Sequence, residues 1–134
     1  MTDKEFDEIR QKFLNDFEQA RPVMEAIGDV VRQEIIVTLI ETGGTGGIRV
    51  GEIQKRTNIS RSAVSHHLRV LRDAQVINVR REGTKNYYFL DPKSSSLRQV
   101  AGFWEQVEPM MALCGKRTEE ELIKGRKRDK GYED

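Results

Sequence analysis

The chain has 134 residues, of which 37% are hydrophobic and 34% charged, and its formal net charge is +1. This length predicts one domain whose core needs no disulfide or structural metal. The longest nearly apolar run, residues 35–40, is far shorter than the roughly 20 residues that cross a bilayer. The N-terminus lacks an apolar signal region, and the single Cys114 cannot form an internal disulfide. We therefore expect a cytoplasmic protein without a membrane partner.

The first 41 residues predict helices. Residues 3–20 place apolar side chains at helical spacing. Pro22 is expected to break this helix or to open a second one over residues 22–27. Asp29 is a plausible N-cap for a further helix over residues 30–41.

A glycine-rich segment, residues 42–47, follows these helices. A phosphate-binding loop would need a Gly-Lys-Ser/Thr sequence between a strand and a helix, and neither feature occurs here. We therefore interpret this segment as a loose connector. Residues 48–50 then predict a strand with a single rung.

The middle of the chain predicts two helices followed by a hairpin. A short helix over 51–57 and a turn over 57–59 precede a helix over 61–74, with Ser60 as its N-cap. Residues 76–81 and 86–90 have the composition of strands joined by a turn over 82–85. The fold class is therefore mainly α with a small β-hairpin, a winged helix-turn-helix with extra N- and C-terminal helices.

Positive charge is concentrated in this middle part. Residues 54–85 carry 8 Lys and Arg against 2 Asp and Glu, a net +6, whereas residues 1–41 are net −5. Such an asymmetry in a nearly neutral chain favours a polyanionic partner.

The helix over 61–74 has two distinct faces. Val64, Leu68 and Leu71 form an apolar stripe. The opposite stripe is small, polar and basic, so it can enter the major groove of double-stranded DNA and present donors and acceptors to base edges. Its residues, with the first-turn Arg61 included, are Arg61, Ser62, Ser65, His66 and Arg69. The predicted hairpin adds cations and a hydroxyl that suit phosphate contacts: Arg80, Arg81, Thr84 and Lys85.

Two stretches carry a resemblance to a known family: residues 60–74, SRSAVSHHLRVLRDA, and residues 81–90, REGTKNYYFL. They resemble the ArsR-type winged-helix repressors of bacteria, with an overall match over roughly residues 22–92. The resemblance implies a homodimer that binds an operator and is released by a small-molecule inducer. It also implies that Ser62, Ser65, His66 and Arg69 face the groove and that Tyr87 joins Arg81 and Lys85 in the wing.

The metal sites of this family do not carry over. The helix before the turn contains no cysteine, and residues 96–114 contain neither His nor Asp. The adjacent His66 and His67 point about 100° apart on a helix and converge poorly on one ion. We expect no metal and no cofactor, and we expect His67 to be half-buried and hydrogen-bonded. No acid, base and nucleophile form a catalytic set, so we expect no enzyme.

The terminal helices carry more apolar surface than a winged helix needs. A last long helix is predicted over residues 96–114, kinked or ended early by Pro109. We expect the terminal helices to form a dimer interface, the alternative being that they pack on their own monomer. The interface residues would be Phe6, Ile9, Phe13, Phe17, Val100, Phe103, Trp104, Val107 and Met111.

The expected organisation has four parts: an N-terminal helix over 1–21, the DNA-binding domain over 22–92, a C-terminal helix over 93–114 and a charged, partly disordered tail over 115–134. Control by an organic ligand near Trp104 and Met111, or by oxidation of Cys114, remains an alternative. A second alternative is a winged-helix protein-interaction module that does not bind DNA.

Overall fold

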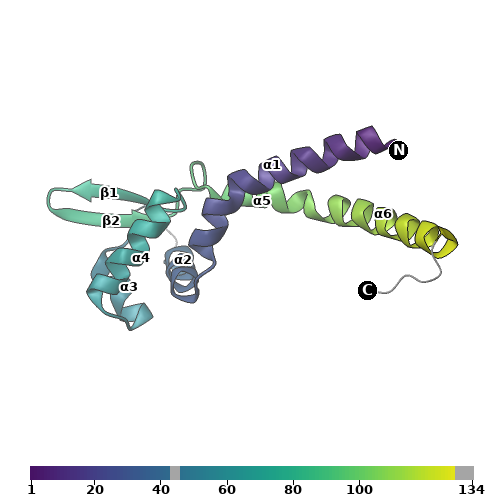
Figure 1. Ribbon diagram of the computed structural model, residues 1–134. Helices are drawn as coiled ribbons and strands as arrows, with labels where there is room; N and C mark the ends of the chain where they lie inside the picture. The colour runs from purple at the N-terminus through teal and green to yellow at the C-terminus, as the bar shows by residue number, and fades with distance from the viewer. Residues whose placement is uncertain (43–45, 129–134) are drawn as a thin grey trace. The chain divides into compact units, whose positions relative to one another are not determined.

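The computed structural model describes residues 1–42 and 46–128 (Figure 1). Their helices and strands are α1 (Asp3–Ile27), α2 (Val30–Glu41), α3 (Val50–Thr57), α4 (Arg61–Asp73), β1 (Asn78–Glu82), β2 (Lys85–Phe89), α5 (Leu97–Glu105) and α6 (Val107–Arg128). They belong to two compact units: residues 19–101, here called the winged unit, and residues 1–18 with 102–134, here called the terminal unit. The predicted fold class is confirmed. None of the described helices is long and apolar enough to cross a membrane.

The core of the winged unit forms where α2, α3 and α4 meet. Ile35, Ile53 and Leu71 are fully buried there, one from each helix. The predicted apolar stripe of α4 is confirmed, since Val64 and Leu68 are also buried. This burial fixes which face of α4 points inward, and therefore which face remains in solvent.

Pro22 does not interrupt the first helix, because α1 runs through it to Ile27. The predicted break was therefore wrong. A proline inside a helix costs about 3 kcal/mol. Ala20, Val23 and Ala26 flank it on one buried face, and their burial offsets a cost of that order.

The end of α4 explains why the first strand begins later than predicted. Gln75 takes a left-handed conformation, φ 62°. Its N–H donates to the Arg72 carbonyl (2.8 Å), and that of Val76 donates to the Leu71 carbonyl (2.9 Å). These bonds form a Schellman motif. Val76 and Ile77 both enter the core instead of alternating, so β1 starts at Asn78 rather than at residue 76.

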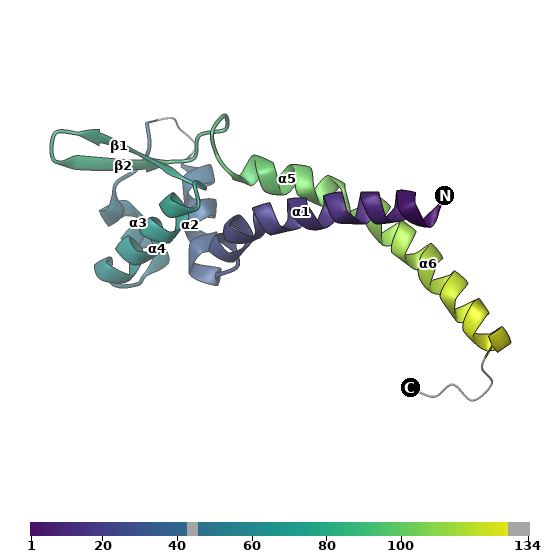
Figure 2. The same cartoon turned by 45° about the horizontal axis from the view of Figure 1, so that its top comes forward.

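The hairpin projects from the helices of the winged unit (Figures 1 and 2). Strands β1 and β2 are antiparallel, and Glu82 pairs with Lys85 across a two-residue turn. Gly83, at the first central position, has φ 62°, a position where a type II′ turn favours glycine. The turn is thus shorter than the predicted 82–85.

A single rung joins the hairpin to the chain before α3. Ile48 and Tyr88 exchange two backbone hydrogen bonds of 2.9 and 2.8 Å, which confirms the predicted one-rung strand. At Gly47, φ 76°, a Cβ would lie 2.8 Å from the Tyr88 carbonyl oxygen. Only glycine fits this close approach. The predicted connector over 42–47 lies partly outside the described residues, which resume at Gly46.

The C-terminal part is two helices rather than the single one predicted over 96–114. The chain leaves α5 after Glu105 and enters α6 at Val107. Pro109 lies in the first turn of α6, where its missing N–H would have no intrahelical partner anyway. Helix α6 then continues to Arg128, so the charged segment is helical as far as the structure describes it. Disorder was expected beyond about residue 125 of the tail over 115–134; residues up to Arg128 are helical, and residues 129–134 lie outside the described residues.

Candidate nucleic-acid interface

Helix α4 presents the predicted polar stripe to solvent. Its capping residue, Ser60, accepts a hydrogen bond from the Ala63 N–H at 3.2 Å, as predicted. The preceding turn is closed by Asn58 in a left-handed conformation, φ 55°, whose N–H donates to the Gln54 carbonyl (2.8 Å). Every predicted groove-facing residue of this helix is exposed: Arg61, Ser62, Ser65, His66 and Arg69.

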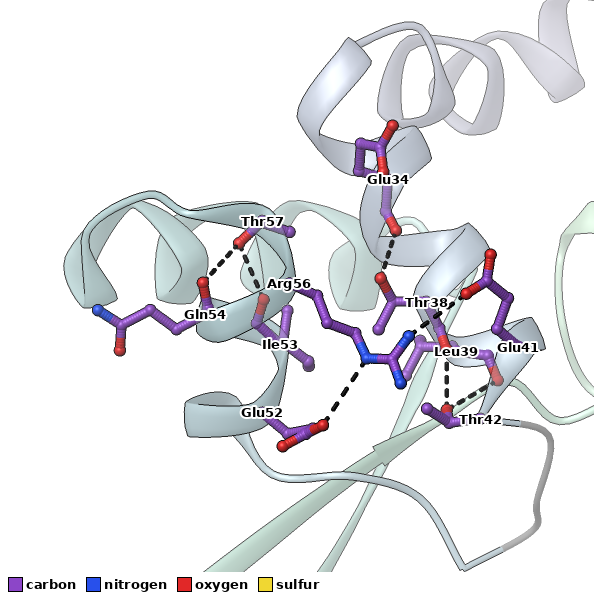
Figure 3. Close-up of polar contacts among 10 residues, drawn as sticks. All are labelled: Glu34, Thr38, Leu39, Glu41, Thr42, Glu52, Ile53, Gln54, Arg56 and Thr57. Atoms are coloured by element: carbon purple, nitrogen blue, oxygen red, sulfur yellow. Dashed lines mark hydrogen bonds and ion pairs between the residues drawn. The ribbon is translucent and has the colours of Figure 1, made fainter.

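Helix α3 is braced against α2 by an arginine between two carboxylates (Figure 3). Arg56 lies 3.7 Å from Glu52, one turn earlier on α3, and 3.3 Å from Glu41 at the end of α2. The Thr57 hydroxyl donates to the Ile53 carbonyl (2.9 Å) beside it. Arg56 is therefore occupied within the chain and adds little to the outward positive charge.

His67 is half-buried on the flank of the apolar stripe, as predicted. Its Nδ1 lies 3.0 Å from Nη1 of Arg32 on α2. His67 therefore lies on the side of α4 that packs against α2, and not on the exposed face of α4.

The hairpin cations have unequal surroundings. Arg80 lies over the Tyr87 ring, 4.8 Å from its centroid. It also pairs with Glu82 and donates to the Gly46 carbonyl. Arg81 donates through Nε to the Gly83 carbonyl (2.9 Å). Arg81, Thr84 and Lys85 are exposed, whereas Arg80 and Tyr87 are half-buried.

The eight cations of residues 54–85 fall into three groups, one of which is Arg81 alone, because it donates to the Gly83 carbonyl and has no carboxylate partner within the described residues. Within the described part of the chain, Arg56 and Arg80 pair with carboxylates, and five cations of residues 54–85 have no ion-pair or side-chain hydrogen-bond partner: Lys55, Arg61, Arg69, Arg72 and Lys85. Lys55 and Arg72 were not among the predicted DNA contacts. Spacing could have found Arg72, because it follows Arg69 by three residues on the exposed side of α4.

The residues predicted for a dimer interface fall into three classes. Phe6, Val100 and Phe103 are buried within the chain, and Phe13 and Val107 are half-buried. Within the terminal unit, the Phe103 ring packs 5.1 Å from Phe13 and 5.2 Å from Phe17. The remaining four are exposed: Ile9 (41%), Phe17 (37%), Trp104 (57%) and Met111 (62%). Leu14, which was not selected, is 49% exposed on α1.

The terminal unit also has an apolar groove of about 520 Å³, lined by residues of α1, α5 and α6 that include Phe13, Pro109 and Leu113. Among the described residues, no three His, Cys, Asp or Glu side chains are grouped to hold a metal ion.

Comparison with known proteins gives a family match. The sequence model of the family described as "Bacterial regulatory protein, arsR family" matches residues 29–79 of this chain, from the N-cap of α2 into β1. The transcriptional repressor SdpR of Bacillus subtilis (strain 168) is 38% identical over 69 residues, which are 52% of this chain and 72% of SdpR.

Solved structures show the same fold. Reduced HlyU from Vibrio cholerae N16961 is 25% identical with a TM-score of 0.55, over 67% of this chain and 92% of HlyU. The homodimeric winged helix-turn-helix DNA-binding domain Mb0332 from Mycobacterium bovis is 24% identical with a TM-score of 0.52, over 69% of this chain and 80% of that domain.

Proposed function

This chain belongs to the ArsR family of bacterial regulatory proteins, and from that premise we propose that it binds an inverted-repeat operator as a homodimer and represses transcription. It is a DNA-binding transcriptional regulator with a winged helix-turn-helix. It acts in this proposal by binding and not by catalysis.

The main support for DNA binding is that helix α4 has one buried apolar face and one exposed polar face. Its apolar side is buried between α2 and α3, and its exposed side holds only small polar, histidine and arginine side chains over Arg61–Arg69. In a helix-turn-helix the second helix enters the major groove with its N-terminal residues nearest the bases. Arg61, Ser62, Ser65 and His66 would reach base edges first. Arg69 would contact guanine, the base that an arginine recognises through two acceptors.

We assign the phosphate contacts to cations that have no carboxylate partner within the described residues. Lys85 and Arg81 of the hairpin, with Thr84 between them, would follow the backbone beside the groove. Lys55 and Arg72 would flank α4 on phosphates. Arg80 and Tyr87 would support the hairpin from within, because Arg80 is already held by Glu82 and the Gly46 carbonyl.

The homodimer is supported by exposed apolar side chains on the terminal helices. Trp104, Met111, Ile9 and Leu14 are each at least 41% exposed, and large apolar residues gathered on terminal helices indicate a protein interface. A two-fold dimer would place two α4 helices about 34 Å apart, one turn of DNA, and would require a palindromic site.

Selection of bound duplexes from a random DNA pool, at about 100 mM salt, tests this function. We expect an inverted repeat whose half-sites are one turn apart. Sequence-blind binding alone would contradict the operator. No binding to any duplex, even at low salt, would favour the protein-interaction module.

Lys85→Ala is expected to weaken binding to all duplexes alike. One phosphate contact fewer should reduce the slope of log K against log salt by about one. Fluorescence anisotropy titrations at several salt concentrations measure this slope. Arg80→Ala is the matched control on the same hairpin: because its guanidinium is already ion-paired, the slope should stay unchanged. An unchanged slope in Lys85→Ala would refute the phosphate contact.

A second candidate concerns control of this activity. The groove lined by Phe13, Pro109 and Leu113 has the size and apolar character of an organic-ligand site. We propose it as the place where a small-molecule inducer would bind. Trp104, the only tryptophan, packs 5.8 Å from Phe103, whose ring contacts Phe13 in the groove wall. Quenching of Trp104 fluorescence by a candidate inducer, together with release of DNA, would support this role.

A further inference from the structure

One arginine of α2 connects three helices of the winged unit. The backbone N–H of Arg32 donates to the N-cap carboxylate of Asp29 (3.0 Å). Its guanidinium donates to the carbonyls of Ala26 and Glu25 in the last turn of α1. These carbonyls lie where a helix leaves acceptors without intrahelical donors and where its dipole favours a cation.

The same guanidinium reaches α4 through His67. Nη1 of Arg32 and Nδ1 of His67 are 3.0 Å apart. Arginine has only donors, so Nδ1 of His67 is the acceptor in this hydrogen bond, and the bond requires the ring tautomer that carries its proton on Nε2. Within the described residues this is the only side-chain hydrogen bond from α4 to another helix.

We propose that the Arg32–His67 hydrogen bond positions α4 for DNA, and that protonation of His67 releases it and weakens operator binding. Arg32 and His67 are positioning residues in this proposal, because they lie behind the exposed face that Arg69 and Ser65 present. The inference rests on the proposed role of α4 in DNA binding.

The charged groups around His67 explain the direction of the effect. A protonated ring would bring a second cation to within 3.0 Å of Arg32 and would lose its acceptor. Asp29 is close enough to interact with the His67 charge, and its own pKa is lowered, chiefly by the Arg32 N–H. On α4, the His66 ring lies 5.5 Å from that of His67, and α1 contributes carbonyls through Glu25 and Ala26.

The chain has only two histidines, which makes a pH profile of DNA binding interpretable. His66 is exposed on the DNA-facing side, so its protonation should strengthen binding, opposite in sign to that of His67. In a His66→Gln background, we expect affinity for the selected duplex to fall about three- to tenfold between about pH 7.5 and about pH 5.5. Anisotropy at fixed salt measures this.

His67→Asn is the rescuing variant, because its amide oxygen stands near the position of Nδ1 and accepts a hydrogen bond without titrating. In the His66→Gln background it should keep the affinity seen at high pH and remove the loss on acidification. His67→Ala should have the low affinity at both pH values. Persistence of the acid loss in His67→Asn would overturn the proposal.

The tautomer of the His67 ring provides a readout that does not need DNA. Nitrogen-15 NMR of the imidazole should show His67 at neutral pH as the tautomer protonated on Nε2, and Arg32→Lys should change that tautomer population. A proton on Nδ1 of His67 at neutral pH would overturn the proposal, because Arg32 could not then donate to it. Failure of DNA binding alone, with the expected tautomer present, would instead count against the role of α4 in DNA recognition.

Discussion

Arg69→Ala is expected to weaken binding to the selected operator by about 1–3 kcal/mol and to relax the sequence preference at one position of each half-site. Arg69 lies on the exposed side of α4, one turn beyond Ser65, and it has no ion-pair partner within the described residues. Its guanidinium is therefore free to donate two hydrogen bonds to one guanine. Anisotropy titrations against the operator and against single-base variants of it measure both effects.

Arg72→Ala is the matched control for Arg69→Ala. Both side chains are exposed arginines of α4 without ion-pair partners in the described chain, but Arg72 lies further from the N-terminal end that enters the groove. Its loss should weaken operator and random DNA equally. Neither substitution should change the free energy of unfolding by more than about 0.5 kcal/mol, since each replaces an unpaired surface side chain. Equal losses on operator and random duplexes in Arg69→Ala would refute the base contact.

The helices around the interface could be predicted because their capping residues and apolar spacing in the sequence agree with how the helices pack. In α4 the N-cap Ser60 and the stripe of Val64, Leu68 and Leu71 indicate the same start and the same buried face. Asp29 likewise caps α2 as predicted. Wherever local propensity and apolar periodicity agree, the tertiary structure has no reason to override them.

The wrong predictions lie where tertiary packing outweighs a local rule. Pro22 has a helix-breaking side chain, but its neighbours Val23 and Ala26 are buried, so α1 continues. Val76 and Ile77 have β propensity, but the Schellman end of α4 turns both into the core. Neither outcome can be derived from spacing, because each depends on which distant residues fill the core.

The number of charges at the site could be predicted from the sequence, but their pairing within the chain could not. Composition locates the basic segment, yet it does not tell which cations are already paired. From the sequence, Arg80 was predicted to contact DNA. In the structure its guanidinium already interacts with Glu82, the Gly46 carbonyl and the Tyr87 ring. The Gly46 contact spans 34 residues of chain, and such a long-range partner leaves no local signal in the sequence.

Replacing both Trp104 and Met111 by glutamate is expected to give a monomer and to reduce operator affinity by about a hundredfold or more, because a monomer contacts only one half-site. The two side chains are 57% and 62% exposed, so the monomer loses little packing when they change. Each would carry an unpaired charge into the proposed apolar interface, where burial of a charge without a partner is costly. Sedimentation velocity measures the association state, and anisotropy on the full and the half operator measures the affinity.

Val30→Glu provides the control for added charge on an exposed apolar position. Val30 is 74% exposed in the first turn of α2, outside the terminal helices, and an acidic residue is favoured at that end of a helix. This variant should stay dimeric and keep its operator affinity. The Trp104 and Met111 double variant should bind full and half operators with nearly equal affinity, because its subunits act independently. If the double variant remains dimeric, Trp104 and Met111 are not part of the dimer interface. If it is a monomer with undiminished operator affinity, operator binding does not require a dimer.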